Sequence, residues 1–158
     1  MKKRIFLVVL CLMVLTTGAF AMEKTAGFGG AFRTFENLTG FGGFGFFGPG
    51  RYIELSVGFS YYSHEYWDDN LFTAQLGLYG KFPFVLTDRL VLFPTGGLEL
   101  EYAFESEELI FWGLLGGGLD FFLTENMFLR THALFGLGRV ADFSGFGFSF
   151  KVGLGWMF

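Results

Sequence analysis

Alternation of apolar residues with small or polar ones is the feature that most constrains how this 158-residue chain can fold. Between residues 52 and 62 the apolar side chains occupy every second position: Ile53, Leu55, Val57, Phe59 and Tyr61. The last segment repeats the pattern with Phe146, Phe148, Phe150, Val152, Leu154, Trp156 and Phe158. Successive side chains of a strand point to opposite faces, so a period of two predicts β-strands with one apolar face.

Segments of similar length lie between these two, and short polar or turn-forming groups such as Thr87-Asp88-Arg89 separate them. We predict strands at residues 51–62, 71–86, 90–104, 109–123, 127–140 and 146–158, with two shorter strands within residues 26–47. The total is eight antiparallel strands.

The stretch GFGGFGFFGPG, residues 40–50, is the most unusual part of the chain. We interpret it as a short strand that ends in a tight turn at Gly48-Pro49-Gly50. Phe44 and Phe46 fall on one face of that strand together with Gly42. We expect these phenylalanines to face lipid, while the glycines leave room beside the backbone.

Composition separates a membrane barrel from a soluble β domain. Aromatic residues make up 22% of the chain, and the very large side chains alternate with Gly, Ser and Tyr. A soluble sandwich would hide its apolar face and expose charges, whereas a lipid-facing exterior around a crowded polar interior accounts for both faces. The fold class predicted is all-β, an eight-stranded antiparallel transmembrane β-barrel. An even strand number puts both termini on one side, the periplasmic one.

The N-terminus has the order of a secretory signal peptide. Lys2, Lys3 and Arg4 precede apolar residues 5–15, and Ala19-Phe20-Ala21 forms a small-x-small cleavage site. We predict a cleaved signal at residues 1–21 and a single outer membrane barrel domain at residues 22–158. Cleavage would remove Cys11, the only cysteine, and three of the 11 basic residues. The 15 acidic residues are then in clear excess, which argues against nucleic acid as a partner.

The chain resembles the small eight-stranded outer membrane barrels of Gram-negative-type bacteria, the family that includes outer membrane proteins A and X. The resemblance covers residues 26–158 and is most specific in the last strand, where apolar residues alternate up to the terminal aromatic residue. The residues of this C-terminal assembly signal are Val152, Leu154, Trp156 and Phe158. In that family such an ending is recognised by the barrel assembly machinery. The resemblance implies outer membrane localisation in contact with membrane lipid, and periplasmic chaperones as partners during biogenesis.

The inward parity of the predicted strands collects most of the charges. These residues are Glu54, Lys81, Glu99, Glu101, Asp120, Arg130, His132 and Lys151. The interior of an eight-stranded barrel is so narrow that side chains fill it. We therefore expect opposite charges there to form ion pairs that close the interior. A turn centred on Glu125 would place Asp120 opposite Arg130. The alternative is a path for ions through the barrel.

No constellation in the sequence supports catalysis. Gly40-Phe41-Gly42-Gly43-Phe44-Gly45 matches a dinucleotide fingerprint, but neither a helix nor a βαβ unit follows. Ser63 and His64 are neighbours that would point to opposite faces of a strand. We therefore predict a structural or surface role, no enzyme and no cofactor. Two alternatives stay open: a secreted soluble β-barrel that binds an apolar ligand, and an outer membrane lipid-modifying enzyme.

The predicted outer connections are acidic and contain no lysine or arginine. They hold Glu36, Glu65, Asp68, Asp69, Glu105, Glu107, Glu108 and Asp142. The plain interpretation is a solvated rim on a structural barrel. The sharper one is a rim that binds divalent cations or a basic partner, because carboxylates are hard-oxygen ligands for calcium or magnesium. The candidate metal ligands are Glu65, Asp68, Asp69, Glu107 and Glu108.

Overall fold

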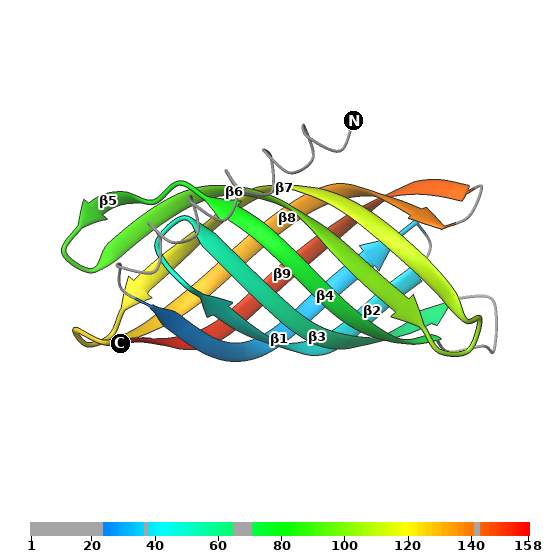
Figure 1. The fold of residues 1–158 in the computed structure, drawn as a ribbon, viewed down its shortest axis with the longest axis horizontal. Helices are drawn as coiled ribbons and strands as arrows, with labels where there is room; N and C mark the ends of the chain where they lie inside the picture. Colours follow the sequence, from blue (N-terminus) through cyan, green and yellow to red (C-terminus); the bar gives the residue numbers. More distant parts are fainter. Residues whose placement is uncertain (1–23, 37, 65–70, 141–142) are drawn as a thin grey trace, which may run out of the picture.

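The strands follow one another around a single closed sheet (Figure 1). The computed structural model describes residues 24–36, 38–64, 71–140 and 143–158. Its strands are β1 (Thr25–Phe35), β2 (Leu38–Gly48), β3 (Ile53–His64), β4 (Leu71–Lys81), β5 (Phe84–Thr87), β6 (Leu90–Ala103), β7 (Glu108–Phe122), β8 (Met127–Val140) and β9 (Phe143–Met157). The predicted signal peptide lies outside the described residues.

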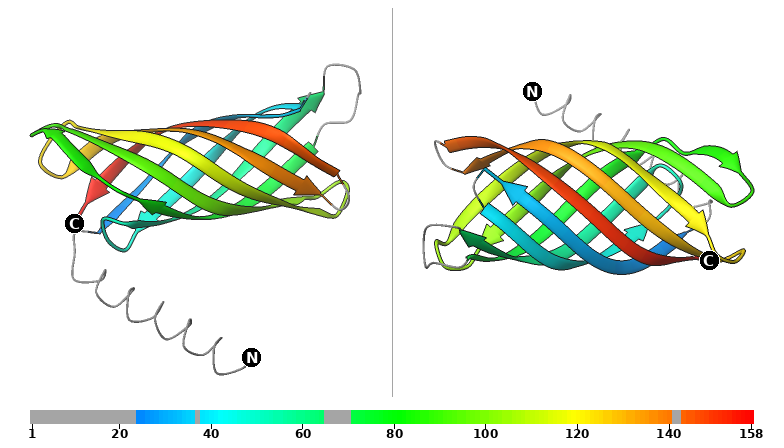
Figure 2. Two further views of the ribbon diagram at one scale, coloured as in Figure 1. Left: turned by 90° about the horizontal axis from the view of Figure 1, so that it is seen from above. Right: turned by 180° about the vertical axis from the view of Figure 1, so that it is seen from behind.

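Two pairings close the sheet into a barrel. β1 pairs antiparallel with β9 from Thr25↔Met157 to Phe35↔Gly147, so the first strand meets the last. β4 pairs with β6, and β5 continues along β6 in the same register, since Lys81↔Thr95 is followed by Phe84↔Leu92. β4 and β5 thus form one wall strand, and the barrel has eight, as the sequence predicts. The strands run obliquely around it (Figure 2).

Proline divides the strand predicted at residues 71–86. The backbone N–H of Phe82 still donates to the Pro94 carbonyl at 3.1 Å, but Pro83 has no N–H to continue the ladder. The prediction of one uninterrupted strand was therefore wrong at this point. β5, all of whose residues are exposed, forms a hairpin with β6 that projects at one end of the barrel (Figure 1).

The glycine-rich stretch forms β2, but its predicted orientation was wrong. Phe44 and Phe46 are only 7% and 4% exposed and point into the barrel, whereas Phe41 is 65% exposed on the outside. Pairing with β1 sets this orientation: Arg33 faces inward and lies opposite Gly40, so even-numbered residues of β2 face inward. Phenylalanine occurs on both parities of the stretch, so the period alone did not reveal which set faces lipid.

The two ends of the barrel differ in what they carry. Lys24 and Phe158 exchange backbone hydrogen bonds of 3.0 and 2.9 Å, which ties the first described residue to the last. We call this end, with the turns after β2, β5 and β7, the terminal rim. The other end, with the connections after β1, β3, β6 and β8, is the far rim.

The outer surface of the wall is apolar. Exposed side chains from every strand face outward, and the most exposed include Phe28, Leu98, Leu115, Phe135 and Phe146. In the described part of the chain, no helix is long and apolar enough to cross a membrane. Closed sheets leave no strand edge unsatisfied in lipid, so an apolar exterior around a charged interior defines a transmembrane β-barrel. Barrels of this type are typical of outer membranes.

Candidate functional site

The interior is the most chemically distinctive part of the barrel. Eight charged side chains are buried among the described residues: Arg33, Glu54, Lys81, Glu99, Glu101, Asp120, Arg130 and Lys151. Four are acids and four are bases. Arg33 was not among the residues predicted to face inward. The predicted set held four acids and three permanent cations, and Arg33 supplies the positive charge that was missing from it.

The half nearer the terminal rim holds the terminal cluster, which we define as Glu54, Lys81, Asp120 and Arg130. Arg130 donates from Nε to Asp120 Oδ1 at 2.6 Å and from Nη2 to Oδ2 at 2.5 Å. Its remaining Nη1 contacts Glu54, which also accepts from Lys81 Nζ at 2.9 Å. The facing pair Asp120↔Arg130 follows the register expected from a turn at Glu125. One guanidinium thus forms ion pairs with two carboxylates.

Aromatic rings enclose the Arg130 guanidinium. Its Cζ lies 4.6 Å from the Phe46 ring centroid, 4.8 Å from that of Phe128 and 5.3 Å from that of Phe93. A cation over a desolvated ring is attracted by the quadrupole of the ring. A Cβ added at Gly155 would clash with the ring of Phe128, so glycine at this position leaves room for the ring.

The half nearer the far rim holds the far cluster, which we define as Arg33, Glu99, Glu101 and Lys151. Arg33 Nη1 pairs with Glu99 and lies 3.6 Å from Glu101 Oε2. Lys151 Nζ donates to Glu99 Oε2 at 3.2 Å and to the Tyr79 hydroxyl at 3.0 Å. Tyr79 in turn donates to Glu99.

Neutral donors satisfy the second carboxylate of the far cluster. Trp112 Nε1 donates to Glu101 Oε2 at 2.9 Å, and Thr73 Oγ1 and Gln75 Nε2 donate to Oε1 at 2.5 and 3.2 Å. Trp112 also packs edge-on against Phe35, with ring centroids 4.8 Å apart. This part of the interior therefore combines a hydrogen-bonded carboxylate with an apolar cluster of Phe35, Tyr79, Ile110, Trp112, Leu114 and Leu134. The interior is both polar and aromatic.

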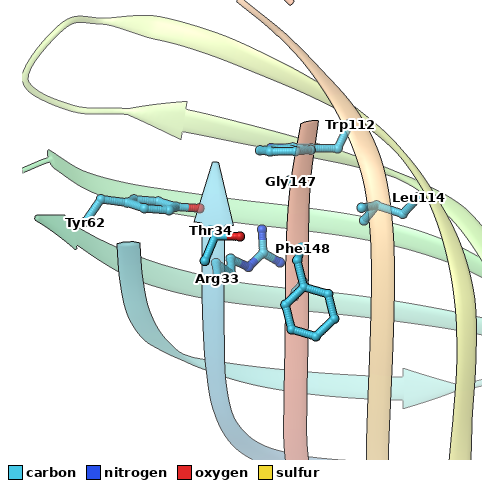
Figure 3. Close-up of a pocket in the computed structure, with 8 residues that line it drawn as sticks. Arg33, Thr34, Tyr62, Trp112, Leu114, Gly147 and Phe148 are labelled. Atoms are coloured by element: carbon cyan, nitrogen blue, oxygen red, sulfur yellow. The ribbon is translucent and has the colours of Figure 1, made fainter. Parts of the chain in front are cut away.

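Two hollows adjoin these clusters. A vestibule of about 250 Å³ opens at the terminal rim, between the β5–β6 hairpin and the terminal cluster, with Lys81, Asp120 and Arg130 among its lining residues. A cavity of about 10 Å³ lies near the far rim, lined by Arg33, Tyr62, Trp112, Leu114 and Ser149 among others (Figure 3). The two hollows share none of their lining residues.

The two histidines lie in different parts of the barrel. His132 is buried, with Nε2 3.9 Å from Glu54 Oε1, and its ring packs edge-on against Phe93 and Tyr79. It therefore faces the interior, away from membrane lipid. His64 ends β3, and Glu65 lies outside the described residues.

The far rim contains part of the predicted acidic set. Glu36 accepts from the Phe146 N–H and Glu105 from the Phe72 N–H, both at 2.9 Å, so these two carboxylates cap strand ends. Glu107 and Glu108 are exposed. Glu65, Asp68, Asp69 and Asp142 lie outside the described residues. Among residues that the structure describes, no three acidic, histidine or cysteine side chains are grouped so as to hold a metal ion.

Comparison with known proteins supports the fold class. The N-terminal β-barrel domain of Pseudomonas aeruginosa OprF is 16% identical over 86% of this chain and 96% of that domain, with a TM-score of 0.51. Neisserial surface protein A is 12% identical over 85% of this chain and 94% of that protein, with a TM-score of 0.56. No protein-family model and no curated protein matches the sequence. The chain has the fold of the small eight-stranded outer membrane barrels.

Proposed function

We propose that the protein is a closed, structural barrel of the outer membrane, without catalysis and without a pore. The observation that carries the proposal is the paired interior. Buried charges face each other as ion pairs and hydrogen bonds from Glu54 and Arg130 near one end to Glu99 and Glu101 near the other. Unpaired charges in such a space would be costly, so the pairs stabilise the closed state.

A liposome swelling assay tests this proposal. Vesicles that contain purified wild-type protein should swell no faster than empty vesicles in small sugars. The matched variant replaces Phe46 and Arg130 by alanine, which removes one ring and the central cation of the terminal cluster. Swelling by the wild type would refute the closed barrel. The alternative of a soluble secreted barrel predicts recovery without detergent and no change in gel mobility on boiling.

The exterior of β9 supports a proposal about biogenesis. Trp156 and Phe158 are exposed at the terminal rim, and Val152 is exposed further along the same face. With Leu154 they form an apolar row that we infer is recognised by the barrel assembly machinery, after delivery by periplasmic chaperones. Replacing Phe158 with Ser should lower the amount of assembled barrel in cells but leave refolding into detergent unchanged. An equal loss in both assays would indicate a folding defect instead.

The acidic far rim remains a finer proposal. Glu107 and Glu108 are exposed carboxylates that would supply hard-oxygen ligands to divalent cations or charges to a basic partner. Two of the other described acids already accept backbone hydrogen bonds, which favours the structural interpretation of the rim.

A further inference from the structure

The small cavity near the far rim has an unusual set of polar atoms. Arg33 Nε and Nη2, Tyr62 Oη and Ser149 Oγ are all buried, and none of them makes a well-formed hydrogen bond with the described residues. The three residues are 3%, 2% and 3% exposed, and all of them line the same cavity of about 10 Å³. In Figure 3 the Tyr62 hydroxyl points toward the Arg33 side chain, below the Trp112 indole.

Buried polar atoms of this kind need a partner, because a buried donor or acceptor without one costs free energy. A water site needs roughly 10–15 Å³ of space and two to four polar contacts. The cavity supplies both. Arg33 offers two N–H donors, whereas each hydroxyl can accept as well as donate.

We propose that this cavity is a binding site for a single ordered water molecule. The water accepts from Arg33 Nε and Nη2 and donates to Tyr62 Oη and Ser149 Oγ. It thereby joins β1, β3 and β9 across the inside of the barrel. The site goes beyond the proposed closed barrel, since a barrel could be closed with this cavity either wet or dry.

Charge balance favours water over a small anion. Arg33 and Lys151 are already matched by Glu99 and Glu101 in the far cluster. An added chloride would leave a net negative charge buried at the same place, and burial of an unpaired charge is far more costly than burial of a hydrogen-bonded neutral molecule.

Water-to-methyl NOE and ROE spectra of methyl-labelled protein in detergent micelles test the site. Leu114 lines the cavity and its methyl protons do not exchange with water. We expect a cross-peak between Leu114 and a long-lived water. Leu134, buried in the same apolar cluster but not in the cavity lining, should show none. Absence of the Leu114 cross-peak in the wild type would overturn the proposal.

Two variants and one change of salt separate the alternatives. Ser149→Val fills the cavity and should abolish the Leu114 cross-peak, whereas Ser144→Val, on the exposed outer face of the same strand, should leave it unchanged. A cross-peak that survives in a folded Ser149→Val protein would come from exchanging hydroxyl protons and would refute the water. The chemical shift of Arg33 Hε should be equal in chloride and sulfate buffers. A shift that saturates with chloride concentration would show that chloride, not water, occupies the cavity.

Discussion

The two ionic clusters inside the barrel stabilise their buried carboxylates in different ways. In the terminal cluster, one cation serves two carboxylates, since Arg130 pairs with both Asp120 and Glu54. In the far cluster, the Glu101 carboxylate has neutral donors in Trp112, Thr73 and Gln75 besides the Arg33 charge 3.6 Å away. The terminal cluster therefore depends on a single side chain, Arg130, whereas several donors share the carboxylate of the far cluster.

Loss of Arg130 should therefore have the largest effect. Arg130→Met leaves Asp120 without its bidentate partner and Glu54 with Lys81 as its one remaining lysine or arginine partner. Removal of one partner from a buried pair costs about 3–5 kcal/mol. Urea unfolding in detergent micelles, followed by the gel-mobility difference between folded and unfolded barrel, measures this loss.

A double-mutant cycle with Asp120→Asn shows whether the loss comes from the pair. We expect Asp120→Asn combined with Arg130→Met to cost clearly less than the sum of the single changes, because neither charge is then left unpaired. Additive losses would contradict the ion pair between β7 and β8.

The rings of the terminal cluster should give the next largest effect. Phe46→Leu removes the ring nearest to the Arg130 guanidinium and should cost about 2 kcal/mol, the size of a desolvated cation–π contact. Phe41→Leu is the matched control, since Phe41 lies on the same strand but faces outward. Both variants are compared in the same urea titration. Equal losses of unfolding free energy would contradict the placement of Phe46 inside the barrel and Phe41 outside it.

Redundancy in the far cluster predicts a smaller loss. Trp112→Phe keeps an aromatic ring against Phe35 but removes the indole N–H that donates to Glu101. Since Thr73 and Gln75 still donate to that carboxylate, we expect a loss of about 1.5 kcal/mol, the lower end of the range for a single hydrogen bond to a charged group. A loss as large as that of Arg130→Met would show that the far cluster also depends on one side chain.

The far rim should give the smallest effect. Calorimetric titration of calcium into the detergent-solubilised barrel, repeated with Glu107→Gln and Glu108→Gln together, measures what these two exposed carboxylates contribute. A rim that binds cations predicts heat from the wild type that falls in the variant. Equal and negligible heats would leave only the structural interpretation.

Sequence periodicity predicted the wall of the barrel well, because large apolar residues mark the lipid face of most strands. The register of β7 and β8 also followed, since a short turn at Glu125 fixes which residues face each other. Periodicity did not predict the orientation of β2, because phenylalanine occurs on both faces of this strand. The orientation of β2 depends on its pairing with β1. Pro83 interrupts the hydrogen-bond ladder because it has no N–H, a property that the alternation of apolar residues does not register.

Contacts across the interior could not be predicted in the same way. Glu54 and Arg130 are 76 positions apart in sequence and belong to strands that are not neighbours in the sheet. Which charges meet there depends on strand stagger and side-chain length. The inward parity of the charges was accessible from sequence, but their division into two clusters, and the rings around Arg130, required the structure.

The proposed closed barrel requires that paired charges and aromatic rings fill its interior from end to end. Planar bilayer recordings test it most directly, with the purified wild type compared against the Phe46→Ala and Arg130→Ala double variant. We expect no steady current from the wild type at either polarity. Reproducible single-channel steps of constant size from wild-type protein would contradict it.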